Sequence, residues 1–110
     1  MDTNIKTMNF EIGERNFGTI IISFENALSI YIFEDKPRLG TFGISIPGTS
    51  IVPASTLYIT GSKHENYVRM MGERIAIKVQ KLVLISVNLE EAETELLLEI
   101  MKKIEENLPK

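Results

Sequence analysis

The segment that most constrains the fold is 62–89, where a helical pattern is followed within a few residues by a short apolar strand. Ser62 stands three residues before Glu65, and this spacing predicts a capping box at the start of a helix. Glycine destabilises a helix interior, so we expect Gly72 to be there because it permits close packing onto a sheet. The apolar residues of this helix recur at i, i+3 and i+7 and define one stripe: Val68, Met71 and Ile75.

The helix is expected to end near Lys78, and the apolar run 82–87 comes next. This run is too short for a buried helix, so it predicts a central strand that is covered on both faces. A second helix is predicted to close the chain, with Asn88 and Glu91 again at capping-box spacing. Its apolar stripe consists of Leu97, Ile100, Met101, Ile104 and Leu108.

Ahead of residue 62 the pattern is one of short apolar runs separated by turn residues, which is typical of successive strands. Residues 1–6 are expected to form a flexible tail, and alternation at Met8, Phe10 and Ile12 predicts the first strand. Further strands are predicted over 18–25, 28–33, 39–46 and 54–60.

Sequential strands of this kind favour antiparallel pairing, and the helices come only after them. We therefore predict a single α+β domain over residues 1–110. Its architecture is expected to be an antiparallel sheet of about six strands in the order β-β-β-β-β-α-β-α, with two helices packed on one face.

The composition argues against several classes of function. The chain has no cysteine, which excludes disulfides and thiolate chemistry. Its net charge of −3 argues against a nucleic-acid partner, because phosphate binding requires a basic face. No apolar stretch is long enough to span a membrane, and residues 1–4 lack the features of a signal peptide. We therefore expect a cytoplasmic protein with no membrane partner.

No residue pattern predicts an active site. His64, the only histidine, has no obvious orienting partner and is interpreted as a surface residue. Glu34 and Asp35 lie in a turn beside Lys36, and turn chemistry explains them better than paired carboxylates or a metal site. The glycines of 40–48 do not open a helix, so they predict bulges or close backbone contacts rather than a phosphate-binding loop. We predict no enzymatic activity, no cofactor and no metal.

The predicted strands have two apolar faces, and the helices need only one of them. The face expected beneath the helices holds Ile20, Ile22, Phe24, Leu28, Ile30, Ile32, Phe42, Ile44, Ile46, Val83, Ile85 and Val87. The second face is expected to mix small polar residues with Ile21, Tyr31, Phe33, Leu82 and Leu84. Aromatic and aliphatic side chains in such a mixture are typical of a protein interface, so these residues are predicted to form a dimer interface. The alternative is a set of scattered exposed apolar side chains, which is normal on a protein surface.

Three stretches of the chain resemble one known family: Pro53-Ala54-Ser55-Thr56-Leu57, Glu73-Arg74-Ile75-Ala76 and Lys81-Leu82-Val83-Leu84-Ile85-Ser86-Val87-Asn88-Leu89. Together they are similar to the small proteasome-assembly chaperones, the third and fourth members of the eukaryotic assembly set, with the fourth the closer match. The likeness covers roughly residues 28–108 and includes the place of the last helix, whereas residues 1–27 are not matched.

The resemblance implies a non-enzymatic chaperone that pairs through its sheet and holds proteasome α-type subunits while the α-ring assembles. In the family the working unit is a dimer, which implies a homodimer or a heterodimer with a related chaperone. Other assembly chaperones dock through a C-terminal tail that ends in a hydrophobic residue, a tyrosine and a last residue. This chain ends Asn107-Leu108-Pro109-Lys110, so we expect it to bind its client through the folded surface.

The client-binding residues are sought in two exposed, charged segments, the turn at 34–38 and the helix entry at 62–66. The residues proposed there are Glu34, Asp35, Lys36, Arg38, Lys63 and His64.

Two alternative functions stay open. A dimeric roadblock- or longin-like scaffold that binds a small GTPase or another protein complex would place helices before or between the early strands. A small-ligand enzyme or binding protein would use residues 40–48 and would need converging polar groups in a pocket.

Overall fold

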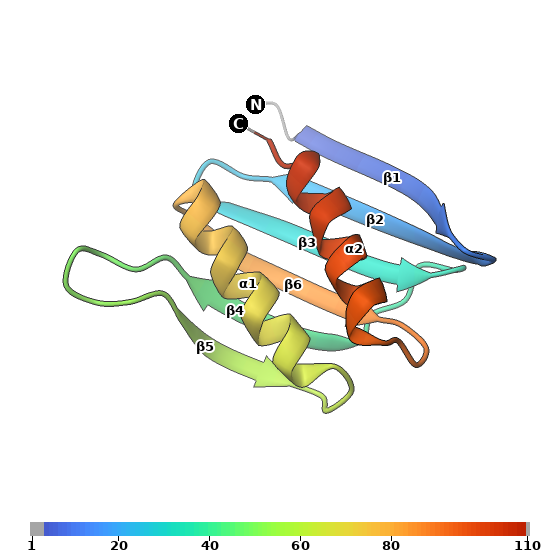
Figure 1. The fold of residues 1–110 in the computed structure, drawn as a ribbon. Helices are drawn as coiled ribbons and strands as arrows, with labels where there is room; N and C mark the ends of the chain where they lie inside the picture. The colour runs from blue at the N-terminus through green and yellow to red at the C-terminus, as the bar shows by residue number, and fades with distance from the viewer. Residues whose placement is uncertain (1–3, 110) are drawn as a thin grey trace.

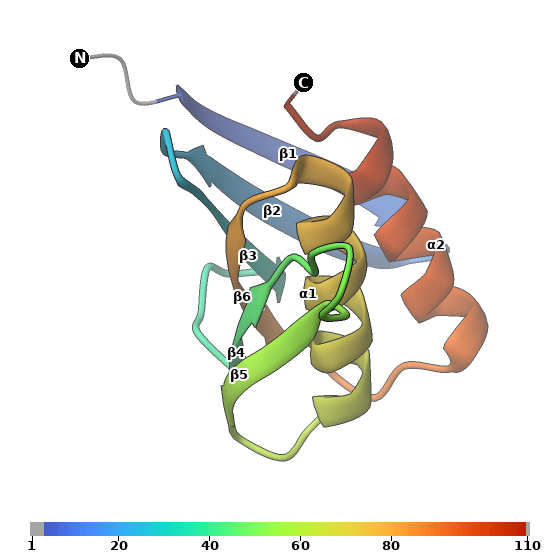
Figure 2. The ribbon, with the colours of Figure 1, turned by 90° about the vertical axis from the view of Figure 1, so that its left-hand side faces the viewer.

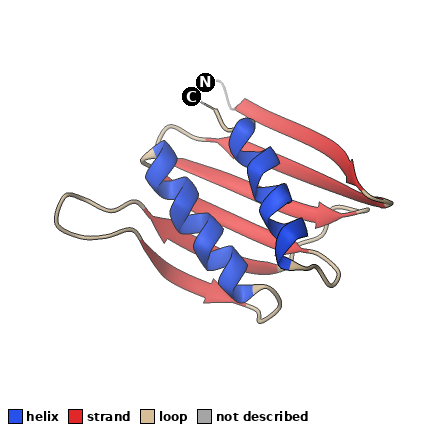
Figure 3. Ribbon diagram, in the orientation of Figure 1, coloured by secondary structure: helices blue, strands red, loops and turns tan. Residues whose placement is uncertain are grey.

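The computed structural model describes residues 4–109 and shows a six-stranded sheet with both helices on one side (Figures 1 and 3). A side view shows the two layers, with the sheet in one and the helices in the other (Figure 2). In chain order the elements are β1 (Asn4–Ile12), β2 (Arg15–Ser23), β3 (Ala27–Glu34), β4 (Thr41–Ile46), β5 (Ser55–Thr60), α1 (Glu65–Val79), β6 (Leu82–Asn88) and α2 (Thr94–Glu106). This order confirms the predicted α+β fold class.

β6 lies in the middle of the sheet, between β3 and β4, so the strand order is β1-β2-β3-β6-β4-β5. β3 and β6 run parallel, with Ile30 opposite Ile85, and the other neighbouring pairs are antiparallel. A parallel pair requires a crossover, and α1 provides it by running back across the sheet from β5 to β6 (Figure 1). The predicted antiparallel pairing therefore holds for every pair except this one, because periodicity does not report strand direction.

The core fills the space between the sheet and the two helices. Ile100, Met101 and Ile104 of the stripe predicted for the last helix are buried there. The Tyr67 hydroxyl of α1 donates to the Leu97 carbonyl of α2 at 2.7 Å and joins the two helices. The largest buried side chains come from β2, β3, β6 and both helices: Phe17, Ile21, Leu28, Ile30, Ile32, Val68, Met71, Ile75, Val83, Ile85, Ile100 and Ile104.

α1 packs closely on β4 because small residues meet at the contact. A Cβ atom at Gly72 would lie 2.6 Å from Ser45 Oγ, and a Cβ atom at Gly43 would lie 2.9 Å from Val68 Cγ1. A side chain at either glycine would force the neighbouring side chain, or the helix itself, to shift. The close packing predicted for Gly72 is confirmed.

The capping box predicted for the first helix does not form. α1 begins at Glu65, and the residue in the cap position is His64, which has a left-handed φ of 60° and makes no side-chain capping bond. Ser62 therefore lies too early in the chain to cap this helix. Instead, the Thr41 hydroxyl donates to the Lys63 carbonyl at 2.5 Å and ties the helix entry to β4.

The second predicted capping box is also absent. β6 extends through Asn88, so α2 starts only at Thr94, with Glu93 in the cap position and no side-chain capping bond. The Asn88 side-chain amide donates to the Leu39 carbonyl at 3.0 Å. A tertiary contact therefore uses the side chain that local spacing assigned to a helix cap.

Three further details of the strands differ from the prediction. β1 begins at Asn4 and pairs with β2 along its length, so residues 4–6 of the predicted tail belong to the sheet, and residues 1–3 lie outside the described residues. β4 begins at Thr41 rather than position 39, because the chain must first cross the end of β6. β6 has a helix on one face only, and Leu82 and Leu84 on its other face stay partly exposed.

Removing buried volume from α2 should destabilise the fold far more than changing its polar side. Ile104 is fully buried, so Ile104→Ala should lower the free energy of unfolding by about 2–4 kcal/mol. The exposed Glu106 is the control, and Glu106→Ala should change it by less than about 0.5 kcal/mol. Urea unfolding followed by circular dichroism measures both, and equally small effects would contradict the docking of α2 on the core.

Candidate protein-binding surface

The side of the sheet without a helix is apolar across four adjacent strands. The register of β2, β3, β6 and β4 turns the following large apolar residues to this side, which we call the open face: Ile20, Ile22, Tyr31, Phe33, Phe42, Ile44, Ile46, Leu82 and Leu84. The other positions that these strands turn to the same side hold Asn16, Gly18, Ala27, Ser29, Ser86 and Asn88. None of the side chains in the two groups is charged.

The placement predicted for Ile21 is wrong. Ile21 pairs with Ile30 and is only 1% exposed, because it lies beneath the helices and not on the open face. Its neighbours Ile20 and Ile22, which were expected beneath the helices, lie on the open face, and Phe24 just beyond β2 is 46% exposed. Three successive isoleucines are apolar on both sides of a strand, so their pattern does not show which side the helices cover.

The two sides of β4 are also the reverse of the prediction. Large residues of this strand lie on the open face: Phe42, Ile44 and Ile46. Small residues lie on the helix side, where α1 leaves no room for large ones: Thr41, Gly43 and Ser45. The small size of the residues beneath α1, and not their hydrophobicity, decides which side of β4 is turned toward the helix.

Tyr31, Phe33, Leu82 and Leu84 lie together on the open face, as the alternation of β3 and β6 predicts. Phe33 is the most buried of them at 7% exposure, and its ring occupies the space above Gly18, where a side chain would collide with it. Their proximity is what an interface requires, and their role as a dimer interface stays a prediction.

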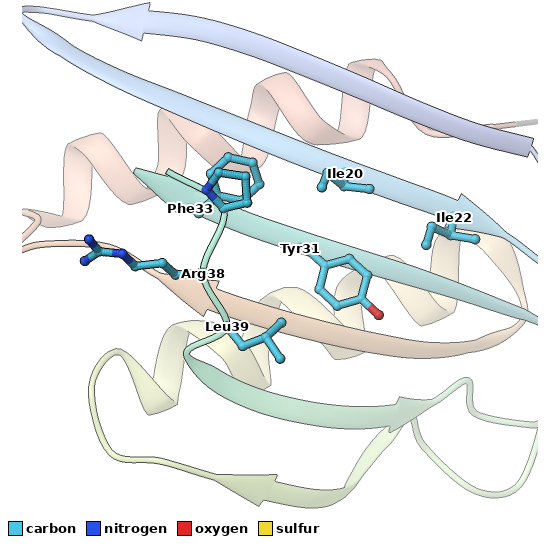
Figure 4. A pocket seen from close by; sticks show the side chains of 7 residues that line it. Ile20, Ile22, Tyr31, Phe33, Arg38 and Leu39 are labelled. Atoms are coloured by element: carbon cyan, nitrogen blue, oxygen red, sulfur yellow. The ribbon is translucent and has the colours of Figure 1, made fainter. Parts of the chain in front are cut away.

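The connection at residues 35–40 passes over one end of the open face and makes one wall of a hollow (Figure 4). The volume of the hollow is about 300 Å³. Leu39 stands at its rim with 74% of its surface exposed, and the Arg38 guanidinium points away from Tyr31 (Figure 4). The lining residues are Ile20, Ile22, Tyr31, Phe33, Pro37, Arg38 and Leu39. This lining is almost wholly apolar and has no converging acid and base, so it fits an apolar side chain better than a reaction.

A charged cluster lies at one end of the sheet. Arg15 holds Glu34 with two hydrogen bonds, from Nε at 2.8 Å and from Nη2 at 2.7 Å. The Glu90 backbone N–H also donates to Glu34, at 3.1 Å, and Arg15 Nη1 donates to the Glu91 carbonyl at 2.9 Å. The hydrogen bond from Arg15 lowers the pKa of the Glu34 carboxyl below its usual range, although burial opposes the shift. Glu34 therefore ties β2 to the segment between β6 and α2.

The other residues predicted to bind a client gather around this cluster. Lys63 Nζ lies 4.0 Å from the Glu90 carboxylate and 3.7 Å from the Glu91 carboxylate, and His64 Nε2 lies 3.3 Å from the Glu90 carbonyl. Asp35, with a left-handed φ of 63°, is exposed, as are Lys36 and Arg38. Loops 34–38, 62–64 and 90–91 thus form one region, which we call the charged end. That it binds a client stays a prediction.

Within residues 4–109, no group of three or more acidic or histidine side chains is arranged to hold a metal ion. The same residues contain no helix that combines the length and the hydrophobicity needed to cross a bilayer. The features that stand out in this part of the chain are therefore surfaces: the open face and the charged end.

Comparison with known proteins supports the fold. No family model matches the sequence, and no curated protein matches it significantly. The structure is similar, with a TM-score of 0.71, to a chain in a crystal structure of a chaperone complex for yeast 20S proteasome assembly. The match covers 96% of this chain and 94% of that chain at 16% sequence identity. At that identity the similarity is one of fold, and it confirms at this level the resemblance that the sequence indicated.

Replacing Glu34 should remove a pH-dependent part of the stability. Because the folded-state pKa of Glu34 lies below its ordinary value of 4.5, the ionised carboxylate stabilises the fold above that value. This contribution is lost as the pH falls through the folded-state pKa. At pH 7, Glu34→Gln should lower the free energy of unfolding by about 1.5–3 kcal/mol, the range for hydrogen bonds to charged groups.

Urea unfolding at pH 7 and again at pH 3 measures this effect. The difference between the wild type and Glu34→Gln should shrink at the lower pH. The exposed turn residue Glu14 provides a matched control, and Glu14→Gln should leave the unfolding free energy nearly unchanged. A difference of the same size at both pH values would mean that the ionised pair with Arg15 is not its source.

Proposed function

We propose that this chain is a non-enzymatic, cytoplasmic chaperone that assists 20S proteasome α-ring assembly by binding α-type subunits as a dimer. The observation that carries the proposal is the open face, an uncovered and uncharged apolar surface on this particular fold. The similarity to a chain of a chaperone complex for yeast 20S proteasome assembly supports the choice of function. The open face supports the choice of a dimer.

The physical argument for a partner rests on the exposed apolar area. Monomeric proteins rarely expose contiguous apolar patches beyond a few hundred Å², because burying such surface is worth about 25 cal/mol per Å². The open face extends over four adjacent strands and carries the partly exposed rings of Tyr31 and Phe42, with the buried ring of Phe33 between the strands. Aromatic enrichment with few charges is the composition of the central part of a protein interface. This composition therefore favours burial of the open face against a second protein.

The charged end is the proposed site of client contact. Its Asp35, Lys36 and Lys63 side chains are exposed at the end of the sheet. An assembly factor must release its client, and contacts of limited area with a polar character allow release more readily than an obligate apolar interface. We therefore assign pairing to the open face and client binding to the charged end.

Both alternative functions are less well supported. A roadblock- or longin-like scaffold would place helices before or between the early strands, whereas within residues 4–109 five strands precede α1. A ligand site at 40–48 would need open space beside its glycines. A Cβ atom at Gly40 would collide with the Val87 carbonyl, and one at Gly48 would lie 2.5 Å from the Val52 carbonyl. These glycines make the close backbone contacts that the sequence predicted.

Placing a charge in the centre of the open face should abolish pairing. Tyr31→Glu would bury an unpaired carboxylate in the interface, at a cost of several kcal/mol. Light scattering should then report a monomer. Met70 on α1, 45% exposed, provides the control, and Met70→Glu should leave the oligomeric state unchanged. A wild-type protein that is already monomeric at tens of micromolar would contradict self-association and leave a related hetero-partner as the cover.

The functional test uses separately expressed proteasome α-type subunits from the same organism. Mixed with the purified protein, at least one of them should shift on a native gel. The shifted complex should disappear when β-type subunits complete the particle, because an assembly factor leaves its product. Lys63→Glu should weaken the shift if the charged end makes the contact, whereas Met70→Glu should not. If no α-type subunit shifts and the assembly yield is unchanged, the chaperone assignment is wrong and the scaffold becomes the better candidate.

A further inference from the structure

Leu39 is an unusual feature of the open face, because its large apolar side chain projects from a surface that is itself apolar. It is 74% exposed, and it lies at the rim of the hollow that Ile20, Ile22 and Tyr31 help to line (Figure 4). The same face therefore carries an apolar projection and an apolar hollow side by side. Because most of the Leu39 side chain stays in contact with water, its burial contributes little to the stability of its own chain.

The projection is held in place by the strand beneath it. The Gly40 backbone N–H donates to Ser86 Oγ at 2.9 Å, and the Asn88 side-chain amide donates to the Leu39 carbonyl at 3.0 Å. Both partners belong to β6, so the peptide group that joins Leu39 to Gly40 is fixed to the centre of the sheet. A group that is already ordered loses less conformational freedom when it binds, which makes it a suitable anchor.

Based on the dimer in the proposed function, we propose that this partner is a second copy of the chain, and that Leu39 of each copy inserts into the hollow of the other. A two-fold dimer brings the same patch of both subunits together, so every projection must find a hollow on the identical surface. The open face meets this requirement by itself, since it holds both features. A partner with a different surface would need only the projection or only the hollow on this face.

The dimensions of the two features agree with this arrangement. A buried cavity of about 150 Å³ holds a benzene molecule, so a hollow of about 300 Å³ admits a leucine side chain. Four strands about 4.8 Å apart and about 20 Å long give the open face a flat area of roughly 400 Å² before side-chain relief is counted. Side-chain relief adds to this area, and a standard interface buries roughly 800 Å² on each partner.

The distribution of charge also favours a second copy. Two identical surfaces bring like charges together wherever a charge lies near the axis, which is destabilising. The central strands turn no charged side chain to the open face, and the charge nearest to the hollow is that of Arg38, whose guanidinium points away from Tyr31 (Figure 4). The open faces of two copies can therefore contact each other without bringing like charges together.

The first test measures self-association by sedimentation equilibrium. Leu39→Asp should raise the dissociation constant of the dimer by about 30-fold or more, the factor expected for a residue that anchors an interface. Ile77 on α1 is the matched control, because it is also an exposed apolar residue at 54% and lies in a helix on the other side of the sheet. Ile77→Asp should change the constant by less than about twofold. Equal melting temperatures would show that both variants fold.

The second test uses the absence of cysteine from the chain. Leu39→Cys is prepared with one affinity tag and Tyr31→Cys with another, and the two are mixed under mild oxidation. The introduced thiols should form a disulfide between the two tagged chains if one copy enters the hollow of the other. A mixture of Ile77→Cys with Tyr31→Cys should give no such product.

Each outcome either supports this arrangement or overturns it. Weakened association of Leu39→Asp together with the cross-linked product supports it. A wild-type dimer that is unaffected by Leu39→Asp and gives no cross-link overturns the insertion of Leu39, and a monomeric wild type overturns the second copy as the partner. Neither of these results changes the expected outcome of the native-gel assay with α-type subunits. A failure of the Leu39 arrangement is therefore distinguishable from a failure of the chaperone proposal.

Discussion

The close approach of α1 to β4 is the constraint on which the rest of the structure depends. Gly72 meets Ser45 at this contact, and Gly43 meets Val68. Because these residues are small, the helix lies close to the strand and only small side chains of β4 fit beneath it. The large side chains of β4 must then turn to the opposite side of the sheet. The small residues of β4 beneath α1 and the large residues of β4 on the open face are therefore consequences of the same contact.

The position of β6 explains the remaining features of the open face. Since β6 lies between β3 and β4, the chain that leaves β3 must cross the end of β6 before it can begin β4. That crossing places residues 35–40 above the sheet, where Leu39 projects and the hollow forms beside it. Two hydrogen bonds keep the crossing in contact with β6: Asn88 donates to the Leu39 carbonyl, and the Gly40 N–H donates to Ser86. A single topological choice thus produces a projection and a hollow together.

A group of charged side chains lies away from the open face, at the charged end. Arg15 and Glu34 join β2 and β3 to the segment before α2, and Lys63 approaches the same segment from the entry to α1. The two loops that the sequence singled out as client-binding candidates are therefore neighbours, although they are distant in sequence. The molecule thus has one apolar surface, to which we assign pairing, and one charged surface, to which we assign client binding.

The sequence by itself determined the type and order of the elements, because the helical and strand periodicities are local properties of the chain. It also placed Tyr31 and Leu84 on one face, since β3 and β6 alternate clearly. Only the tertiary structure decided which side of β2 the helices cover, because the isoleucines at 20–22 suit either side. The direction of β6, the use of Asn88 in a loop contact and the hollow beside Leu39 also depend on contacts between segments far apart in the chain. Local spacing carries no information about such contacts, since packing between elements sets them.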